Sequence, residues 1–230
     1  MDHAPGTIGV LSGDLSRYSW FSQSLLALAM PPETQILWVQ GMWVAAAVNR
    51  LIRNMQPSSA FLMLLSDDHR FAPDLLLRLL AHDVDIVAPL CPLRSPPFNP
   101  SIFHETAAGY RGYTWTDLDG LSGLQPVPTY GGPGVVIKRH VLDTLGDPWF
   151  QCLPGEHPNE DLSFFARCRA QGFQPYVDLE TPLGHSTSLT LYPHRLADAA
   201  WGIRLWSNMD ICVLPAYEFS APGVTFSEAK

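Results

Sequence analysis

The sequence predicts an α/β protein built on a mostly parallel sheet, and two observations lead to this fold class. Over the first 90 residues, short apolar runs alternate with amphipathic helical stretches in the order β-α-β-α-β-α-β. The run at 60–65 has six consecutive apolar residues, which is short for a helix and typical of a strand buried on both faces. This run stops at Ser66, Asp67, Asp68 and His69. Ligands of open α/β sheets bind just beyond the carboxyl ends of the strands, so a ligand site is expected here.

Composition narrows the class of protein. The 230 residues are 47% hydrophobic and 16% charged, which is typical of a well-packed globular chain. No apolar run approaches the roughly 20 residues that span a bilayer, and the start MDHAPGTIGV does not resemble a signal peptide. We therefore expect a cytoplasmic protein without a membrane partner. The net charge of −8 argues against broad binding to nucleic acid or to an anionic membrane. Four scattered cysteines without CxxC spacing indicate reduced thiols and neither a zinc site nor a disulfide framework.

The elements of the first 90 residues follow in order. Residues 7–11 form an apolar, β-branched run that ends at Ser12 and Gly13, which predicts a strand leading into a ligand-facing turn. Helices are expected where apolar residues recur at helical spacing, and Pro31 ends the first of them. The predicted helices are 16–30, 42–55 and 73–82, and the remaining strands are 35–39, 60–65 and 85–90.

The second half is less regular. Residues 91–130 are rich in proline, and an ordered loop of this length is functional or contains small hairpins. A glycine-rich turn at 131–134 precedes an apolar run and a predicted helix at 139–145. Its glycines, among them Gly132 and Gly134, either allow a ligand to approach the backbone or form a plain turn.

A helix is predicted at 160–169, with Asn159 as its N-cap and Glu160 and Asp161 in its first turn. The two carboxylates either stabilise the helix or lie at a cleft, where the helix dipole keeps one ionised as a general base. A strand at 174–179 follows, with His185 just beyond it as a packed, solvent-facing or functional residue. An amphipathic helix is predicted over 197–209. We expect one domain over 1–230, with halves at 1–90 and 91–190 and a terminal helix and tail at 191–230.

Taken together, these segments resemble a metal-dependent glycosyltransferase of the GT-A fold, similar to the family 2-like enzymes, some of which act on phage DNA bases. The resemblance runs from residue 7 to 185 and rests on four stretches in the family's order. They are FLMLLSDDHRFAPDLLLRLL, which resembles the DXD region; DIVAPL; the glycine-rich turn with GVVIKRHVLDTL; and NEDLSFFARCRAQGF followed by YVDLETPLGH.

The resemblance implies a set of site residues. Asp68 and His185 would bind Mn²⁺ or Mg²⁺, which holds the diphosphate of a nucleotide sugar, with a UDP-sugar preferred. Asp161 would be the catalytic base and Glu160 would orient it. The remaining residues implied at the donor and sugar site are Ser12, Gly13, Asn49, Arg50, Ser66, Asp67, Gly132 and Gly134. The chain departs from the family pattern at Ser66, where many relatives have the first Asp of DXD, and at Val48, where they have an Arg that Arg50 would replace.

The function implied is transfer of a hexose to an acceptor hydroxyl with inversion, the acceptor being a soluble glycan or small molecule. One alternative is glycosylation of hydroxymethylated DNA, which requires a basic face. A second is a non-catalytic sugar-nucleotide-binding module, and a third is a metal-dependent hydrolase that uses the carboxylates and histidines at 67–69 and 185. The oligomeric state stays open. The candidates for a basic face are Arg94, Arg111, Lys138, Arg139 and Arg195.

Overall fold

A computed structural model describes residues 3–13, 19–95, 97–107, 109–132, 134–152, 159–187, 190–195, 201–206 and 211–215. The chain divides into two compact units. The first comprises Met1–Pro92 and Asn99–Ser186, and the second comprises Leu93–Phe98 and Thr187–Lys230. The first unit contains residues 1–90 and most of residues 91–190. The second contains all of residues 191–230 together with residues 93–98 and 187–190, and the single domain over 1–230 stays a prediction.

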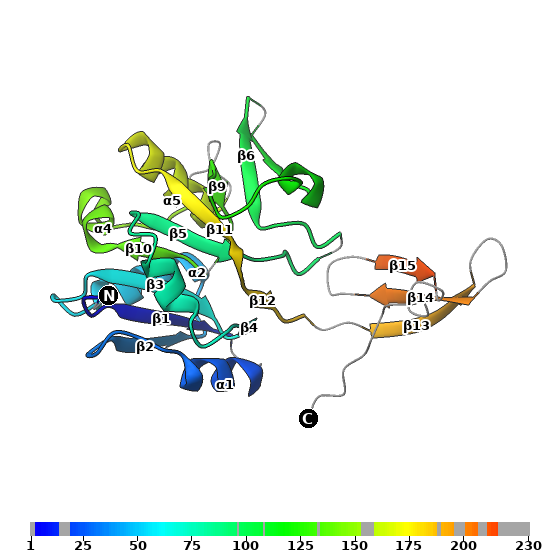
Figure 1. Ribbon diagram of the computed structural model, residues 1–230, viewed down its shortest axis with the longest axis horizontal. Helices are drawn as coiled ribbons and strands as arrows, with labels where there is room; N and C mark the ends of the chain where they lie inside the picture. The colour runs from blue at the N-terminus through cyan, green and yellow to red at the C-terminus, as the bar shows by residue number, and fades with distance from the viewer. Residues whose placement is uncertain are drawn as a thin grey trace. The chain divides into compact units, whose positions relative to one another are not determined.

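The first unit is built on a seven-stranded sheet with strand order β2-β1-β3-β10-β5-β11-β8 (Figure 1). Strands β1, β2 and β3 pair in parallel, as do β5 and β11. Strand β10 runs antiparallel to both β3 and β5, and β8 antiparallel to β11. Five strands therefore share one direction. Their bounds are Thr7–Ser12 (β1), Gln35–Gln40 (β2), Phe61–Ser66 (β3), Ile86–Leu90 (β5), Leu124–Pro126 (β8), Val136–Lys138 (β10) and Pro175–Pro182 (β11).

The predicted strands and helices of the first 90 residues are confirmed, with ends that differ by a few residues. The helices predicted at 42–55 and 73–82 each lack two residues at either end. None of the helices in the described ranges is long and apolar enough to cross a membrane. The helix bounds are Ser19–Ala27 (α1), Val44–Arg53 (α2), Leu75–Leu80 (α3), Arg139–Leu145 (α4) and Glu160–Ala170 (α5).

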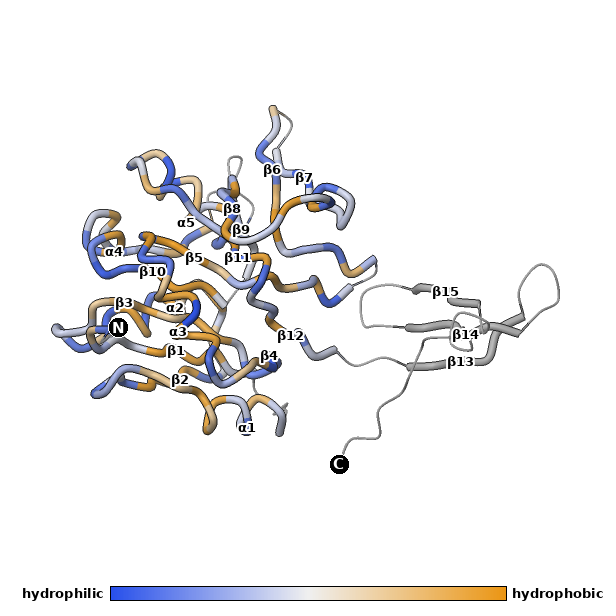
Figure 2. Tube along the Cα trace, viewed as in Figure 1, coloured by the Kyte–Doolittle hydropathy of each residue, from blue (hydrophilic) through white to orange (hydrophobic). Residues whose placement is uncertain are grey.

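Strands β1, β3 and β5 are rich in apolar residues (Figure 2), and most of these residues are buried in the core. Five of the six residues of β3 are buried, which explains why its sequence lacks the alternation of a half-exposed strand. Gly9 allows α2 to pack closely on β1, because a Cβ there would lie 2.8 Å from Leu51 Cδ1.

The irregular region at 91–130 contains the small hairpins that its length predicts. Strand β6 (Ile102–Thr106) pairs with β7 (Gly109–Gly112) and also with β9 (Thr129–Tyr130). A 3-10 helix, Trp115–Leu118, follows the hairpin. The rings of His104 and Tyr113 stack at 3.8 Å between centroids, so part of the aromatic face of this hairpin packs within the hairpin itself.

The helix predicted over 197–209 is wrong where the structure describes it. Trp201–Trp206 is strand β14, which pairs antiparallel with β13 (Thr190–Arg195) and β15 (Ile211–Pro215). The segment WGIRLW places Trp, Ile and Leu at every second position, and aromatic and β-branched residues favour strands. The rest of the predicted helix lies outside the described residues.

Asn49 ties α2 to the segment before α5. Its Nδ2 donates to the Phe150 carbonyl at 2.7 Å, and its Oδ1 accepts from the Trp149 and Phe150 amides at 3.1 and 2.9 Å. The side chain is buried. The amide is thus committed to this segment, and the predicted contact between Asn49 and the nucleotide has no support in the structure.

Asn49→Ala is expected to destabilise the fold by about 2–4 kcal/mol, because two buried backbone groups of Phe150 and the partly buried Trp149 amide lose their partner. Urea denaturation measures the free energy of unfolding. The matched control is Asn54→Ala, since the exposed Asn54 side chain donates to the Arg50 carbonyl, and the loss of this bond should cost less than about 1 kcal/mol. Equal losses for the two variants would contradict this account of Asn49.

Candidate functional site

The carboxyl ends of β1 and β3 lie side by side at one edge of the sheet. Leu11 pairs with Ser66, and the Asp67 amide donates to the Leu11 carbonyl at 3.0 Å. Ser12 ends β1 at the same edge, and its buried Oγ makes no hydrogen bond within the described part of the chain. The predicted donor residues Ser12, Ser66 and Asp67 are therefore neighbours.

A short antiparallel ladder brings the late histidine to this edge. Strand β4 (His69–Arg70) pairs with β12 (Gly184–His185), with His185 opposite His69. The Ser186 amide donates to the Asp68 carbonyl at 2.8 Å. A Cβ at Gly184 would lie 3.1 Å from the Arg70 carbonyl oxygen, so a glycine suits this close pairing.

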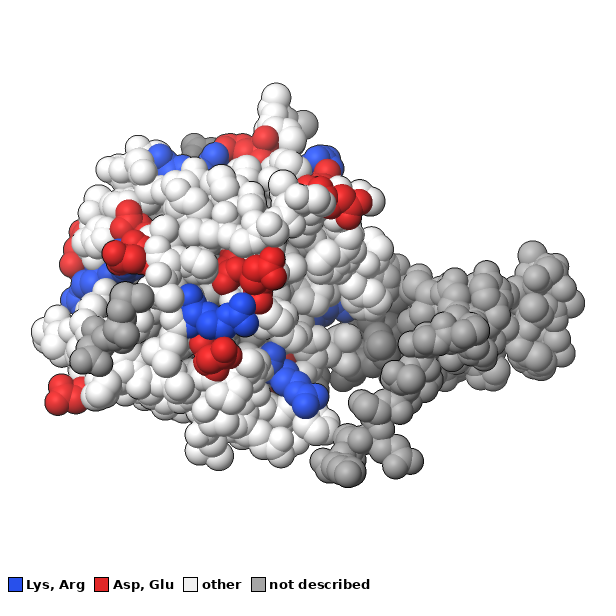
Figure 3. Space-filling view, in the orientation of Figure 1, with Lys and Arg blue, Asp and Glu red and all other residues white. Residues whose placement is uncertain are grey.

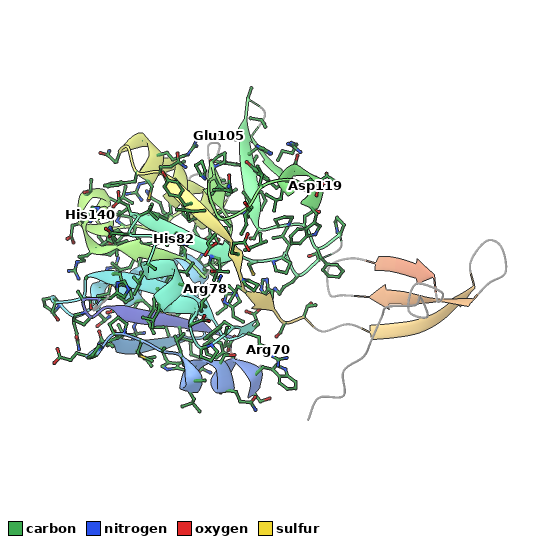
Figure 4. The ribbon with its side chains drawn as sticks, in the orientation of Figure 1. Arg70, Arg78, His82, Glu105, Asp119 and His140 are labelled. Atoms are coloured by element: carbon green, nitrogen blue, oxygen red, sulfur yellow. The ribbon has the colours of Figure 1, made fainter. Side chains whose placement is uncertain are left out.

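A group of contacts between α3 and β11 fixes the chain just before β12. The Asp178 carboxylate accepts from the Glu180 amide at 2.9 Å, from Thr181 Oγ1 at 2.5 Å and lies 3.0 Å from His82 Nε2. Arg78 donates to the Glu180 carbonyl at 2.5 Å. Arg78 lies on α3 and His82 lies two residues beyond its end; both are labelled in Figure 4. The irregularity in β11 between Asp178 and Pro182 is thus held in place.

Asp68 and His185, the two predicted metal ligands, meet at this edge. Asp68 Oδ2 lies 3.4 Å from His185 Nε2, and the side chains are 11% and 18% exposed. His185 Nδ1 lies 2.9 Å from the Pro92 carbonyl, which can only accept, so Nδ1 carries the hydrogen. Nε2 then faces the Asp68 carboxylate, and a proton or a cation held between the two groups stabilises this arrangement.

The separation fits a shared divalent cation. Ligand atoms at about 2.1 Å from one ion lie about 3.0–3.4 Å apart for bond angles between octahedral and tetrahedral values. A carboxylate and an imidazole whose second nitrogen bonds a carbonyl form a common metal-binding pair. The donor set therefore fits Mn²⁺ or Mg²⁺ completed by oxygen ligands.

Two more potential ligands border this pair. His69 and Cys91 are 1% and 2% exposed. One ligand atom from each of His69, Cys91 and His185 lies within 4.8 Å of the others. Cys91 is not among the site residues predicted from the sequence. It directly follows the carboxyl end of β5, and this position is the signal that would have found it.

The predicted base, Asp161, lies in the first turn of α5 and contacts the glycine-rich turn at 131–134. The Gly132 amide donates to Asp161 Oδ2 at 2.8 Å. Gly132 has φ +96° and open space where a Cβ would lie. Gly134 has φ +105°, and a Cβ there would lie 2.5 Å from Leu183 Cδ2. Gly132 therefore binds the Asp161 carboxylate through its amide, whereas Gly134 allows Leu183 to pack closely against the backbone.

The electrostatic setting of Asp161 differs from the expectation. Burial, with a further contribution from the charge of Glu160, raises the pKa of Asp161 to about 7, while the Gly132 amide opposes the shift. The sequence predicted that the helix dipole keeps this carboxylate ionised. Desolvation and the adjacent like charge outweigh the dipole, because a dipole contributes only a fraction of a charge at the first turn.

A buried pair, Cys91 and Tyr130, is affected by both carboxylates. Burial, followed by the charge of Asp68, raises the pKa of Cys91 to about 12. Burial also raises the pKa of Tyr130, with contributions from Cys91 and Asp161. Cys91 and Tyr130 thus lie close enough to Asp68 and Asp161, respectively, to be affected by their charges.

The candidates for a basic face are mostly paired with carboxylates. Arg111 lies 3.6 Å from Asp117, Lys138 lies 2.8 Å from Asp83, and Arg139 lies 3.0 Å from Asp143. On the face shown in Figure 3, acidic and basic side chains are interspersed. Arg50 is exposed, with Nη1 3.7 Å from Met42 Sδ. The side chain of Arg195 lies outside the description.

Asp161→Asn is expected to change the pH dependence of stability. The pKa of Asp161 rises in the fold from 3.8 to about 7, so the folded state holds this proton more tightly than the unfolded chain. The stability it contributes is full below about pH 4 and is lost as the pH rises through about 7. Urea denaturation should show wild-type minus variant stability falling by up to about 4 kcal/mol over this range. Glu160→Gln should reduce that fall, and a flat difference would contradict the raised pKa.

Comparison with known proteins supplies fold neighbours only. No protein-family model and no curated protein sequence matches the chain. Among solved structures, A197 from STIV matches with a TM-score of 0.52 at 14% identity, over 85% of this chain and 92% of that one. GalNAc-T7 with UDP, GalNAc and Mn²⁺ matches with a TM-score of 0.58 at 11% identity, over 80% of this chain and 44% of that one. This chain therefore has a GT-A-like α/β fold.

Proposed function

We propose that this protein is a metal-dependent glycosyltransferase that transfers a hexose from a nucleotide diphosphate sugar, preferably a UDP-sugar, to an acceptor hydroxyl with inversion. The observation that carries the proposal is the contact of 3.4 Å between Asp68 Oδ2 and His185 Nε2 at the carboxyl edge of the sheet. One of the fold neighbours, GalNAc-T7, was solved with UDP, GalNAc and Mn²⁺. Fold and ligand pair thus support the same class of reaction.

The donor half of the site follows from the strand ends. Asp68 and His185 would hold Mn²⁺ or Mg²⁺, and the bound ion would neutralise the charge that develops on the leaving diphosphate. Ser12 and Gly13 at the end of β1 would contact the nucleoside. The buried Ser12 Oγ, which has no partner among the described residues, is a ready donor to a ribose or base oxygen. Ser66, Asp67 and Arg50 complete the proposed donor contacts.

The acceptor half centres on Asp161. A carboxylate with a pKa of about 7 is matched to general-base work near neutral pH, because it is largely ionised there and still basic enough to take a proton. The Gly132 amide fixes one carboxylate oxygen, which leaves the other for the acceptor hydroxyl. The hydroxyl, relieved of its proton, would attack the anomeric carbon opposite the leaving group and invert it. Glu160 tunes the base through its charge, and Gly132 with Gly134 would border the sugar.

The acceptor proposed is a soluble glycan or small molecule. Glycosylation of hydroxymethylated DNA is less well supported, because Arg111, Lys138 and Arg139 each lie against an aspartate, so their charge is partly neutralised. Mass spectrometry of oligonucleotides containing 5-hydroxymethylcytosine, incubated with the enzyme and UDP-sugars, decides between the two acceptors. A mass increase of one hexose would overturn this choice.

Asp68→Asn and His185→Ala are each expected to abolish stabilisation by Mn²⁺ with a UDP-sugar in thermal unfolding. A ligand at about 100 times its Kd should stabilise the wild-type protein by about 2.7 kcal/mol. The control is His140→Ala, since His140 is exposed on α4 and pairs with Asp85 at 3.0 Å; it should retain the full shift. If His185→Ala responds like wild type while Mn²⁺ still promotes donor binding, the ligand assignment fails.

Asp161→Asn is expected to lower sugar transfer by about 10²–10⁴-fold while leaving Mn²⁺-dependent donor binding intact, because only proton transfer is lost. In the wild-type protein, kcat/KM for transfer should rise with pH and level off above about 7, the pKa of Asp161. Glu160→Gln should move this rise to lower pH. Nucleotide release against a panel of hydroxyl acceptors supplies the rates. Donor binding without transfer to any acceptor in the wild-type protein would favour a non-catalytic sugar-nucleotide-binding module.

A further inference from the structure

The edge of the sheet where Asp68 and His185 meet has more metal-binding side chains than a Mn²⁺ or Mg²⁺ site requires. Beside the Asp68–His185 pair lie a second imidazole and a thiol, and one ligand atom from each of His69, Cys91 and His185 lies within 4.8 Å of the others. All three come from different strand ends: His69 begins β4, Cys91 follows β5 and His185 ends β12. Their convergence is therefore a product of the fold and not of local sequence.

The thiol changes which cations this edge can select. Mg²⁺ and Mn²⁺ prefer oxygen ligands, whereas a thiolate with imidazoles favours zinc-class ions such as Zn²⁺ and Co²⁺. Ligand atoms around a tetrahedral zinc ion lie about 3.3–3.8 Å apart, so side-chain shifts of about 1 Å would close the present spacing. Asp68 Oδ2 is 3.4 Å from His185 Nε2 but lies outside the set of ligand atoms that are within 4.8 Å of one another, so its side chain would have to turn toward His69 and Cys91 to become a fourth ligand. The partial exposure of His185 gives the ion a path to the two buried residues.

Ligation through Nδ1 of His69 would require a weak hydrogen bond to be released. The Ser66 amide donates to His69 Nδ1 at 3.3 Å, which is long for a hydrogen bond. Release of this bond, with a turn of the ring, frees a nitrogen for a cation. His185 needs no such change, because its Nδ1 already contacts the Pro92 carbonyl and leaves Nε2 as the ligand atom.

We propose that His69, Cys91 and His185, with Asp68 as the fourth ligand, form a binding site for a zinc-class divalent cation. On binding, a sulfur–metal bond forms and the thiol proton passes to solvent, with no change of oxidation state. This proposal holds whether or not the protein transfers sugars. It has one consequence that rests on the proposed function: because both sites use Asp68 and His185, Zn²⁺ would exclude Mn²⁺ and inhibit transfer.

Co²⁺ added to the full-length reduced protein tests the site, because a cobalt–thiolate bond gives an intense near-ultraviolet absorption band that oxygen and nitrogen ligands do not give. The expected result is one equivalent of this band together with the visible bands of tetrahedral Co²⁺, both removed by Zn²⁺. Absence of the near-ultraviolet band in folded wild-type protein would overturn the proposal.

Matched cysteine variants assign the sulfur. Cys91→Ser should lose the band and bind Zn²⁺ at least about 10-fold more weakly. Cys152→Ser/Cys168→Ser/Cys212→Ser keeps Cys91 as the one cysteine of the four in the sequence and should retain the band. A band that survives in Cys91→Ser, or that is lost from the triple variant while it stays folded by circular dichroism, would contradict the assignment.

The outcome for zinc is separable from that for sugar transfer. Mn²⁺ with a UDP-sugar should still stabilise Cys91→Ser, because Asp68 and His185 remain. If Co²⁺ gives no thiolate band but this Mn²⁺ effect persists, the zinc site is wrong and the transferase proposal stands. If the thiolate band forms but no nucleotide sugar stabilises the protein with Mn²⁺, the zinc site stands and the transferase proposal fails.

Discussion

The pairing of β4 with β12 is the interaction on which the candidate site depends. Two residues of each strand stand opposite each other, and the Ser186 amide extends the contact to the Asp68 carbonyl at 2.8 Å. These few bonds fix the register that places His185 beside Asp68. A slip of one residue would turn the His185 side chain to the other face of the ladder and separate the two ligands. The Asp178 contacts that hold the end of β11 therefore matter for the site as well as for the sheet.

The acceptor side is governed by a balance between burial and local charge. Asp161 lies at the first turn of α5, where the helix dipole favours an ionised carboxylate. Burial and the neighbouring charge of Glu160 outweigh this effect and raise the pKa of Asp161 to about 7. The single amide of Gly132 offsets only part of the shift. A carboxyl group in this state both accepts a proton near neutral pH and costs the fold little when it is protonated, which suits a base that alternates between the two forms.

Most of the fold follows from local sequence signals, and most of what was missed depends on long-range contacts. The buried run of β3 and the apolar stripe of α2 predict their elements directly. The position of β10 between β3 and β5 could not be foreseen, because its three residues pair antiparallel with strands far away in the sequence. Asn49 was placed at the nucleotide because its role in binding residues 149–150 is invisible in its own segment. Cys91 was read as an isolated thiol, since only the folded chain brings it to His69 and His185.

The central claim is that Asp68 and His185 hold one divalent ion together with the donor nucleotide. A crystal structure of the protein with Mn²⁺ and a UDP-sugar tests it most directly, through the anomalous scattering of manganese. The account predicts one peak at about 2.1 Å from both Asp68 Oδ2 and His185 Nε2, with the diphosphate oxygens completing the coordination. Bound nucleotide with manganese elsewhere, or with neither residue within bonding distance of it, would contradict the claim.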